Sequence, residues 1–172
     1  MPLTRRQVLG CVAASAAAGL APSASRAQDA SPARKEVPST GESIPVIGLG
    51  TWITFNVGED PVLRDECADV MAAFFAAGGR AIDSSPMYGS SQGVVGYGLA
   101  KLGITEDLFA ADKVWTSSGA EGPSQIEQSR RRWGIERFDL MQVHNLVAWE
   151  EHLETLLAMK AAGTLRLVGI TT

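Results

Sequence analysis

The stretch Ala81-Ile82-Asp83-Ser84-Ser85-Pro86-Met87-Tyr88-Gly89 is a short apolar run that ends in an acid and continues into a loop with a tyrosine. Two later apolar runs end in a similar way. Leu108–Val114 has Lys113 near its end, and Phe138–Val143 is followed by His144. Runs of this length bounded by polar residues are typical of buried strands. We therefore expect strands whose carboxyl ends carry ionisable side chains.

The same pattern extends in both directions along the chain. Five strands are expected, at Ile44–Gly50, Arg80–Asp83, Leu108–Val114, Phe138–Val143 and Arg166–Thr171. Segments of helical period lie between them. This alternation predicts an α/β fold with a parallel sheet and right-handed crossovers. A doubly wound sheet and a (β/α)8 barrel both satisfy the pattern.

Three of the expected helices have recognisable features. Asp60 can cap the first helix, with Pro61 at its first helical position. The second helix is expected at about Ser91–Leu102, although this segment is rich in glycine. Ser124 and Glu127 have the spacing of a capping box, which predicts the start of the third helix.

Two glycine patterns are candidates for a dinucleotide-binding loop. Gly48–Ile53 follows the first strand, but it lacks the third glycine and no helix begins after it. The glycines within Gly93–Gly98 have the wrong order, and no strand precedes them. Neither segment predicts a phosphate-binding loop, which weakens the doubly wound interpretation.

The polar residues at the strand ends indicate a chemistry. Asp83, Lys113 and His144 end successive strands, and Tyr88 lies in the loop after the first of these. Carboxyl ends of parallel strands share one edge, with neighbouring strands about 4.8 Å apart, so the four side chains can converge. In general, a lysine ammonium lowers the high pKa of a nearby tyrosine, and a carboxylate keeps that lysine charged. A histidine can then orient a carbonyl oxygen, so the set resembles a proton-donor site.

These motifs resemble those of the aldo/keto reductases. The similarity covers about residues 36–172 and rests on Ile47–Trp52, Ala81–Gly89, Lys113–Trp115, Phe138–His144 and Lys160–Thr171. The resemblance implies a (β/α)8 TIM barrel and NADPH-dependent reduction of an aldehyde or ketone. It also implies that Tyr88 is the general acid, that Lys113 tunes it, that Asp83 pairs with Lys113, and that His144 orients the substrate.

The resemblance further implies a cofactor site. Thr51 and Trp52 would lie near the nicotinamide and the substrate, and Asp83 and Thr171 would complete the cofactor-binding set. Thr172 stands where the family commonly has an asparagine, and it cannot supply an amide. The preference for NADPH over NADH rests on the resemblance alone. No metal site is assigned.

Several other residues receive structural interpretations. Asp112 should face away from Lys113, because neighbouring residues of a strand point to opposite faces. Cys67 lies on an apolar helix face and is expected to pack there. Asp139 stands near the start of its strand, which indicates a structural role at the far end of the sheet. His152 is expected to be a structural histidine.

Residues 1–27 differ from the rest of the chain, since they contain three arginines and no acid. Arg5-Arg6 precedes the uncharged run Val8–Leu20, and Ser25-Arg26-Ala27 has the small-residue pattern of a cleavage site. These features predict a twin-arginine export signal, its export machinery as a partner, and a periplasmic or exported location. The uncharged run would span about 20 Å as a helix, too short to anchor the protein in a membrane. Cys11 precedes most of the run, which disfavours a lipidation box.

The remaining 145 residues have a net charge of −7, which disfavours nucleic acid as a partner. We expect a flexible lead-in at residues 28–36 and a partial barrel domain at residues 37–172. Five strands do not close an eight-stranded barrel, and complete barrels have roughly 250 residues. We therefore expect a fragment or a truncated gene product. The alternative to a carbonyl reductase is a truncated or non-catalytic relative with a binding or regulatory role and no activity of its own.

Overall fold

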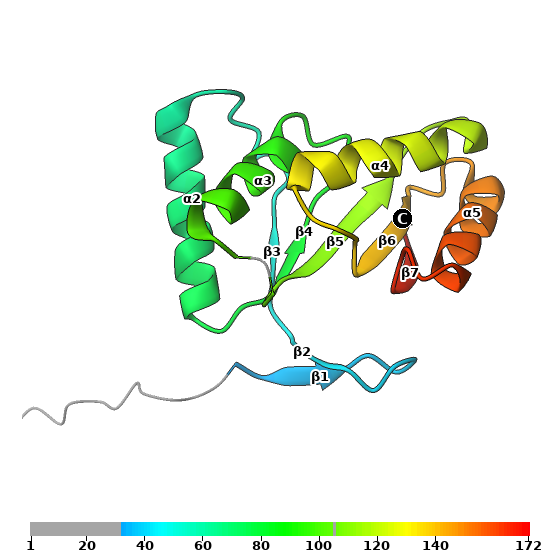
Figure 1. Ribbon diagram of the computed structural model, residues 1–172, viewed down its shortest axis with the longest axis horizontal. Coiled ribbons are helices and arrows are strands. Elements are labelled where there is room, and N and C mark those ends of the chain that lie inside the picture. The colour runs from blue at the N-terminus through cyan, green and yellow to red at the C-terminus, as the bar shows by residue number, and fades with distance from the viewer. Residues whose placement is uncertain (1–31, 105) are drawn as a thin grey trace, which may run out of the picture. The chain divides into compact units, whose positions relative to one another are not determined.

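The computed structural model describes residues 32–104 and 106–172, so the predicted export signal at residues 1–27 lies outside the described residues. A parallel sheet and the helices that follow its strands make up most of the described part (Figure 1). The elements are β1 (Arg34–Glu36), β2 (Ser43–Pro45), β3 (Gly48–Gly50), α2 (Pro61–Ala76), β4 (Ala81–Asp83), α3 (Ser91–Leu102), β5 (Phe109–Val114), the 3₁₀ turn η1 (Gly119–Glu121), α4 (Gly122–Trp133), β6 (Leu140–His144), α5 (Trp149–Ala161) and β7 (Leu167–Thr171). None of the helices in this part has the length and apolar character needed to cross a bilayer.

The order of strands in the sheet distinguishes the two folds that the sequence left open. The order is β3-β4-β5-β6-β7, and every neighbouring pair is parallel. A doubly wound sheet reverses its strand order at a switch point, whereas a barrel adds each strand beside the previous one. Each helix from α2 to α5 also contacts the next helix in the chain. The predicted α/β class is confirmed, and the arrangement is that of a partial (β/α) barrel.

The first predicted strand, Ile44–Gly50, is in fact two strands. β2 ends at Pro45 and pairs antiparallel with β1, while β3 begins at Gly48 and joins the parallel sheet. Residues 34–36, which the sequence analysis assigns to a flexible lead-in, thus form a strand. These three polar residues pair with β2 through backbone hydrogen bonds, a non-local contact that their composition does not reveal.

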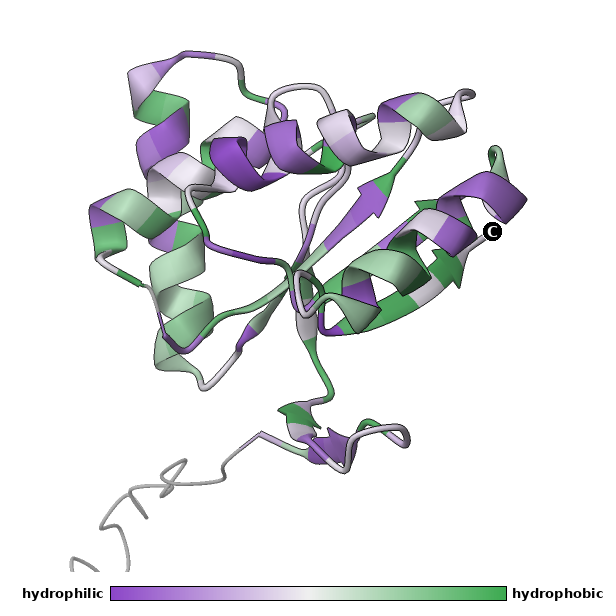
Figure 2. Ribbon diagram, turned by 45° about the vertical axis from the view of Figure 1, so that its right-hand side comes forward, coloured by the Kyte–Doolittle hydropathy of each residue, from purple (hydrophilic) through white to green (hydrophobic). Residues whose placement is uncertain are grey.

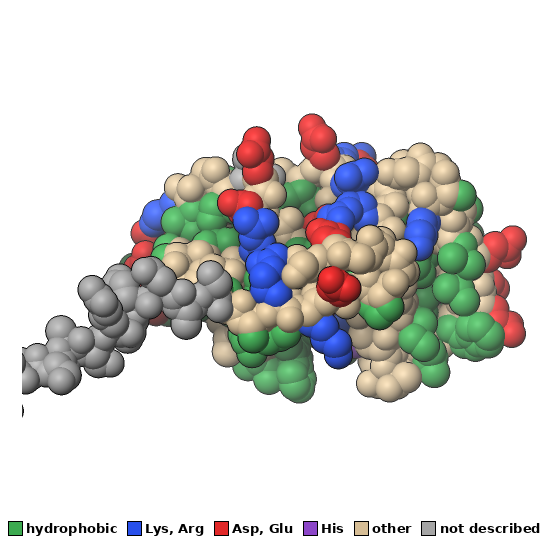
Figure 3. Space-filling view, turned by 90° about the horizontal axis from the view of Figure 1, so that it is seen from below, with side chains coloured by type: hydrophobic (Ala, Val, Ile, Leu, Met, Phe, Trp, Pro, Cys, Tyr) green, Lys and Arg blue, Asp and Glu red, His purple; other side chains and the backbone are tan. Residues whose placement is uncertain are grey.

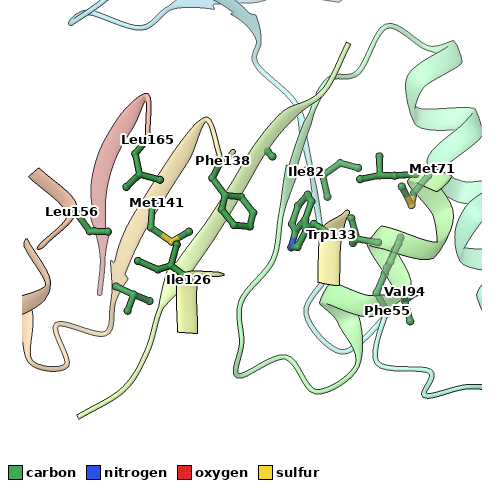
Figure 4. Close-up of a cluster of buried hydrophobic side chains, with 14 of the residues drawn as sticks. Phe55, Met71, Ile82, Val94, Ile126, Trp133, Phe138, Met141, Leu156 and Leu165 are labelled. Atoms are coloured by element: carbon green, nitrogen blue, oxygen red, sulfur yellow. The ribbon is translucent and has the colours of Figure 1, made fainter. Parts of the chain in front are cut away.

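The two faces of the sheet bury two separate apolar clusters. The larger cluster lies between the sheet and the helices and includes Ile82, Trp133 and Met141 (Figure 4). The smaller one lies on the other face, where Phe109, Ala111 and Leu167 pack with side chains of the β1–β2 hairpin and of the strands beside them. Because side chains on both faces of the sheet are buried, the strands appear in the sequence as continuous apolar runs.

One helix start agrees with the sequence prediction and another does not. Asp60 caps α2, and its Oδ1 atom accepts hydrogen bonds from the amides of Val62 at 2.9 Å and Leu63 at 3.1 Å. The predicted capping box at Ser124 and Glu127 is wrong, because α4 already begins at Gly122. The Ser124 hydroxyl donates to a backbone carbonyl in the preceding turn, and Glu127 pairs with arginines one turn further on.

Charged side chains join the hairpin to the amino ends of the strands. Arg166 forms ion pairs with Asp139 and with Glu42 of the hairpin. Asp139 also accepts a hydrogen bond of 2.7 Å from the amide of Ala110. Figure 3 shows basic and acidic side chains interspersed on the face seen from below. Asp139 therefore has the structural role that its position in the strand predicts.

Candidate active site

The carboxyl ends of four strands place the predicted site residues on one edge of the sheet. Asp83 ends β4, His144 ends β6 and Thr171 ends β7, while Lys113 is the penultimate residue of β5. In register, His144 lies beside Thr171, and Lys113 lies beside Gln142 of β6. Figure 2 shows the hydrophilic segment that precedes the tip of β5. Because all the strands are parallel, their carboxyl ends lie at the same edge of the sheet, and residues distant in sequence meet at that edge.

Lys113 and Asp83 form the central ion pair of this edge. The Nζ atom of Lys113 lies 2.5 Å from Oδ2 of Asp83, and it donates a second hydrogen bond of 2.7 Å to the carbonyl oxygen of Ser84. Lys113 is only 3% exposed, whereas the Asp83 side chain is 40% exposed. The ammonium group is thus held inside the fold, and its partner faces the open edge.

Gln142 is a member of the site that the sequence analysis did not identify. Its Nε2 atom donates to Oδ1 of Asp83 at 3.2 Å, so the Asp83 carboxylate is held by β5 and β6 together. Gln142 lies two residues before His144, and residues at this spacing share a face of a strand. That spacing was the signal that could have found it.

Tyr88 approaches the ion pair from the loop after β4. The Lys113 Nζ atom lies 5.0 Å from the centroid of the Tyr88 ring, within the range of a cation–π contact. The imidazole of His144 packs against the same ring, with centroids 6.1 Å apart and planes at 85°. The structure therefore brings the four predicted catalytic residues together. Gly89, at φ +62°, allows the turn: a Cβ atom there would lie 2.3 Å from Oδ1 of Asn56.

His144 is fixed by its neighbour on β7. Its Nδ1 atom lies 2.5 Å from Oγ1 of Thr171, which leaves Nε2 to contact a ligand. Burial lowers the pKa of His144, and the positive charge of Lys113 lowers it further, while Asp83 opposes the shift. The imidazole is therefore neutral at neutral pH and carries a single N–H group.

The two residues after β3 have different surroundings. Thr51 is fully buried, and its Oγ1 atom donates to the carbonyl oxygen of Asp83 at 2.9 Å and lies 2.9 Å from Oγ of Ser84. Its hydroxyl group thus supports the end of β4. Trp52 is 64% exposed, and its ring centroid lies 6.4 Å from that of Tyr88. Of the two, Trp52 is the residue that presents a free surface at the edge.

The loop that carries Trp52 is strained. Ile53 has φ +66°, a left-handed conformation that is rare for a β-branched residue and costs about 1–3 kcal/mol. Two hydrogen bonds hold the turn, from the amide of Thr54 to the carbonyl of Trp52 at 2.8 Å and from Asn56 to Ile53 at 3.1 Å. A strained, exposed turn beside Tyr88 marks this loop as part of the site. Nothing in the composition of the segment indicates the strain.

A second exposed aromatic residue follows β5. Trp115 is 39% exposed, and the side chain of Gln125 on α4 forms two hydrogen bonds with the Trp115 backbone. Oε1 of Gln125 accepts from the Trp115 amide at 2.6 Å, and Nε2 donates to the Trp115 carbonyl at 2.8 Å. His152 of α5 is buried, with Nε2 at 2.8 Å from the carbonyl oxygen of Thr116, so it supports this loop as a structural histidine.

Comparisons with known proteins agree with this fold. The family model described as the aldo/keto reductase family matches residues 46–172. An aldehyde reductase of Saccharomyces cerevisiae is 30% identical over 119 residues, which are 68% of this chain and 34% of that protein. An NAD(P)H-dependent D-xylose reductase of Pyricularia oryzae is 33% identical over 121 residues, covering 65% of this chain and 34% of the relative. The chain thus spans about a third of the length of these curated relatives.

A solved structure extends the similarity to three dimensions. The crystal structure of an aldo-keto reductase from Klebsiella pneumoniae in complex with NADPH superposes with a TM-score of 0.69 at 26% identity. The match covers 81% of this chain and 50% of the Klebsiella protein.

Proposed function

Since the chain belongs to the aldo/keto reductase family, we propose that it serves the NADPH-dependent reduction of an aldehyde or ketone, with Tyr88 as the proton donor. The observation that carries the proposal is the convergence of Tyr88, Lys113 and His144 at one edge of the sheet. Relatives whose names include NAD(P)H-dependent reduction, and a similar structure that holds NADPH, support the choice of reaction and cofactor.

In this proposal Tyr88 gives its hydroxyl proton to the carbonyl oxygen of the substrate. The loss of the proton leaves a phenolate, and the Lys113 ammonium lies 5.0 Å from the ring centroid, where its charge stabilises that anion. Asp83 holds Lys113 in place through the 2.5 Å ion pair. The three residues form a proton donor whose charged parts are already positioned before the substrate arrives.

His144 is proposed to orient the substrate. Because the imidazole is neutral and Thr171 occupies Nδ1, the Nε2 atom can form one hydrogen bond with the carbonyl oxygen. The edge-on packing of the ring against Tyr88 places this bond close to the proton donor. The carbonyl oxygen would thus meet two polar groups, one from the loop after β4 and one from the end of β6.

The exposed residues of this edge fit the nicotinamide end of the cofactor. Trp52 presents a largely uncovered indole beside Tyr88, which forms an aromatic wall suited to a planar ring. Trp52, Asp83 and Thr171 are the residues proposed to surround it, with Thr51 supporting them from behind. When bound, NADPH supplies the hydride for the reduction. NADH is the alternative donor.

The substitution Tyr88→Phe tests the proposed function, measured as NADPH oxidation in the presence of an aldehyde panel. The variant protein is expected to lose reduction by about 100-fold or more while the Kd for NADPH stays within about twofold. Tyr97→Phe is the matched control, because Tyr97 is the other tyrosine of the chain and its hydroxyl bonds Asp65 between α2 and α3. Unchanged turnover in Tyr88→Phe would refute the assignment. Failure of the wild-type protein to bind NADPH would favour a non-catalytic binding role instead.

We also propose export through the twin-arginine route, directed by residues 1–27. The paired arginines before an uncharged run support this proposal. Replacement of both Arg5 and Arg6 by lysine is expected to keep the protein in the cytoplasm of a bacterial host, because that route reads the arginine pair itself. Arg26→Lys is the matched control and should be exported. Equal periplasmic yield from both variants would contradict the proposal.

A further inference from the structure

Asp112 is a fully buried acid that the proposed reaction does not use. It precedes Lys113 on β5, and its side chain lies on the opposite face of the sheet, against α3 and α4. Its Oδ1 atom accepts a hydrogen bond of 2.7 Å from the backbone amide of Lys113. Its Oδ2 atom accepts one of 2.9 Å from Nε2 of Gln92. The carboxylate therefore binds directly to the backbone of the lysine in the candidate site.

Gln92 extends this contact into a buried network. It is 1% exposed, and its Nε2 atom also donates to Oγ of Ser129 at 2.8 Å. Its Oε1 atom accepts a hydrogen bond of 3.0 Å from Nη1 of Arg132. Both polar ends of the amide are engaged, so the rotamer of Gln92 is fixed by its partners. The network joins β5, α3 and α4 behind Lys113.

We propose that Asp112 is a positioning residue that, from the rear face of the sheet, keeps the ammonium group of Lys113 within hydrogen-bond distance of Asp83 and Ser84. The reach of the lysine side chain to its two acceptors depends on where the β5 backbone lies, and Asp112 ties that backbone to two helices. The contact itself is a property of the fold. Its consequence for catalysis rests on the proposed function.

The charge of Asp112 makes this support sensitive to pH. Burial raises the pKa of Asp112 to about 7, against the effect of the hydrogen bonds from Lys113 and Gln92 and of the positive charge of Lys113. Two charged groups lie around the network: Lys113 on β5 and Arg132 on α4, which reaches it through Gln92. The register neighbour of Asp112 on β6 is the apolar residue Met141. Both oxygens of Asp112 accept from N–H donors, so a proton on either oxygen places a third donor against Gln92 or the Lys113 amide and disturbs the network.

The test is the environment of Lys113, followed by nuclear magnetic resonance. The 172-residue chain contains four lysines, so ¹³Cε-lysine labelling gives few signals, and Lys113→Met identifies the relevant one. The Lys113 signal is expected to shift with a midpoint near pH 7 as Asp112 titrates. In Asp112→Asn this step should disappear, while the signal of Lys101, on the outer side of α3, serves as the internal control. A Lys113 signal with the same pH course in both proteins would overturn the proposal.

A charge-swap variant separates positioning from simple loss of folding. In Asp112→Asn alone, the new amide would point a donor at the Nε2 donor of Gln92. In the double variant Asp112→Asn/Gln92→Glu, the amide of residue 112 can donate to the carboxylate of residue 92, which also accepts from Ser129 and Arg132. The double variant is expected to restore the Lys113 signal and to show no step near pH 7. A double variant that remains as perturbed as the single one would count against positioning.

Activity gives a further readout that is independent of the spectroscopic one. Asp112→Asn is expected to lower kcat by about 10-fold to 100-fold with little change in KM, since a misplaced lysine affects the chemical step. The double variant should recover most of that loss. If Tyr88→Phe shows that the proposed function is wrong, the lysine signal still decides whether Asp112 positions Lys113.

Discussion

The Nδ1 atom of His144 lies 2.5 Å from the Oγ1 atom of Thr171, and this contact joins the ends of β6 and β7 at the candidate site. It fixes the orientation of the imidazole, so that Nε2 is the nitrogen left to contact a ligand. Thr171 therefore contributes to the site through His144, in addition to the cofactor contact that the family resemblance implies for it.

Thr171→Val is expected to weaken the orientation of His144. The valine keeps the shape of the side chain but removes the hydroxyl group, and the loss of one hydrogen bond of about 1 kcal/mol corresponds to about a fivefold loss in kcat/KM for the carbonyl substrate. Thr171→Ser retains the hydroxyl group and is the control. Steady-state kinetics with a fixed aldehyde compares the variants, and a loss in Thr171→Ser with none in Thr171→Val would show that the methyl group matters instead.

The lowered pKa of His144 predicts how stability depends on pH. The unfolded chain binds a proton to this histidine at a higher pH than the folded chain does, so the contribution of His144 to the free energy of unfolding should fall as the pH drops below about 6.5. The raised pKa of Asp112 acts in the opposite direction, but equally in the wild type and in His144→Gln, so the test is the difference in unfolding free energy between these two proteins, which should shift against the wild type between pH 7 and pH 5 in urea unfolding. The chain has two histidines, so His152→Gln is the natural comparison. A His144 proton resonance that titrates above pH 6.5 would contradict the assignment.

Replacement of Asp83 and replacement of Lys113 should lower the unfolding free energy by different amounts. Asp83→Ala leaves the buried Lys113 ammonium without its carboxylate and is expected to cost about 3 kcal/mol of unfolding free energy. Lys113→Met leaves a carboxylate that is 40% exposed and bonded to Gln142, so it should cost clearly less. Urea unfolding at pH 7 measures both. The reverse order would mean that the pair is more open to water than the structure shows.

Two glycines of α3, one tightly packed and one in open space, allow the packing of this helix to be tested by substitution with alanine. A Cβ atom at Gly96 would lie 2.0 Å from the carbonyl oxygen of Arg132, so Gly96→Ala should force α3 and α4 apart and destabilise the fold by about 1–3 kcal/mol. Gly93 has no heavy atom within 4 Å of such a position, and Gly93→Ala should stabilise the helix by up to about 1 kcal/mol. Thermal unfolding of the two variants checks the opposite signs.

The parts of the site that were predictable from sequence are those governed by local period and strand direction. Asp83, Lys113 and His144 were found because parallel strands bring their carboxyl ends to one edge, and α3 was found at Ser91–Leu102 despite its glycines. The alternation of side chains along β5 likewise predicted that Asp112 faces away from Lys113, as its contacts show.

The missed features depend on contacts that no local pattern encodes. The β1–β2 hairpin pairs two three-residue strands, too short to show a period. The start of α4 is set by Gly122 and Pro123 after a 3₁₀ turn, which overrode the capping-box spacing at Ser124. The spacing of Gln142 from His144 indicated its face, but its bond to Asp83 and the surroundings of Asp112 follow from the register of β5 against β6 and from how α3 and α4 lie on the sheet.

The adjacency of Asp112 and Lys113 on opposite faces of β5 limits how this strand can change in evolution. Insertion or deletion of one residue between Phe109 and Val114 would exchange the two faces, so that the acid would enter the reaction centre and the ammonium group would be buried among apolar helix residues. Single substitutions in β5 leave the two faces of the strand in place, whereas a change in its number of residues does not. Surviving relatives should therefore keep a constant number of residues in this strand, even where both of these side chains have been replaced.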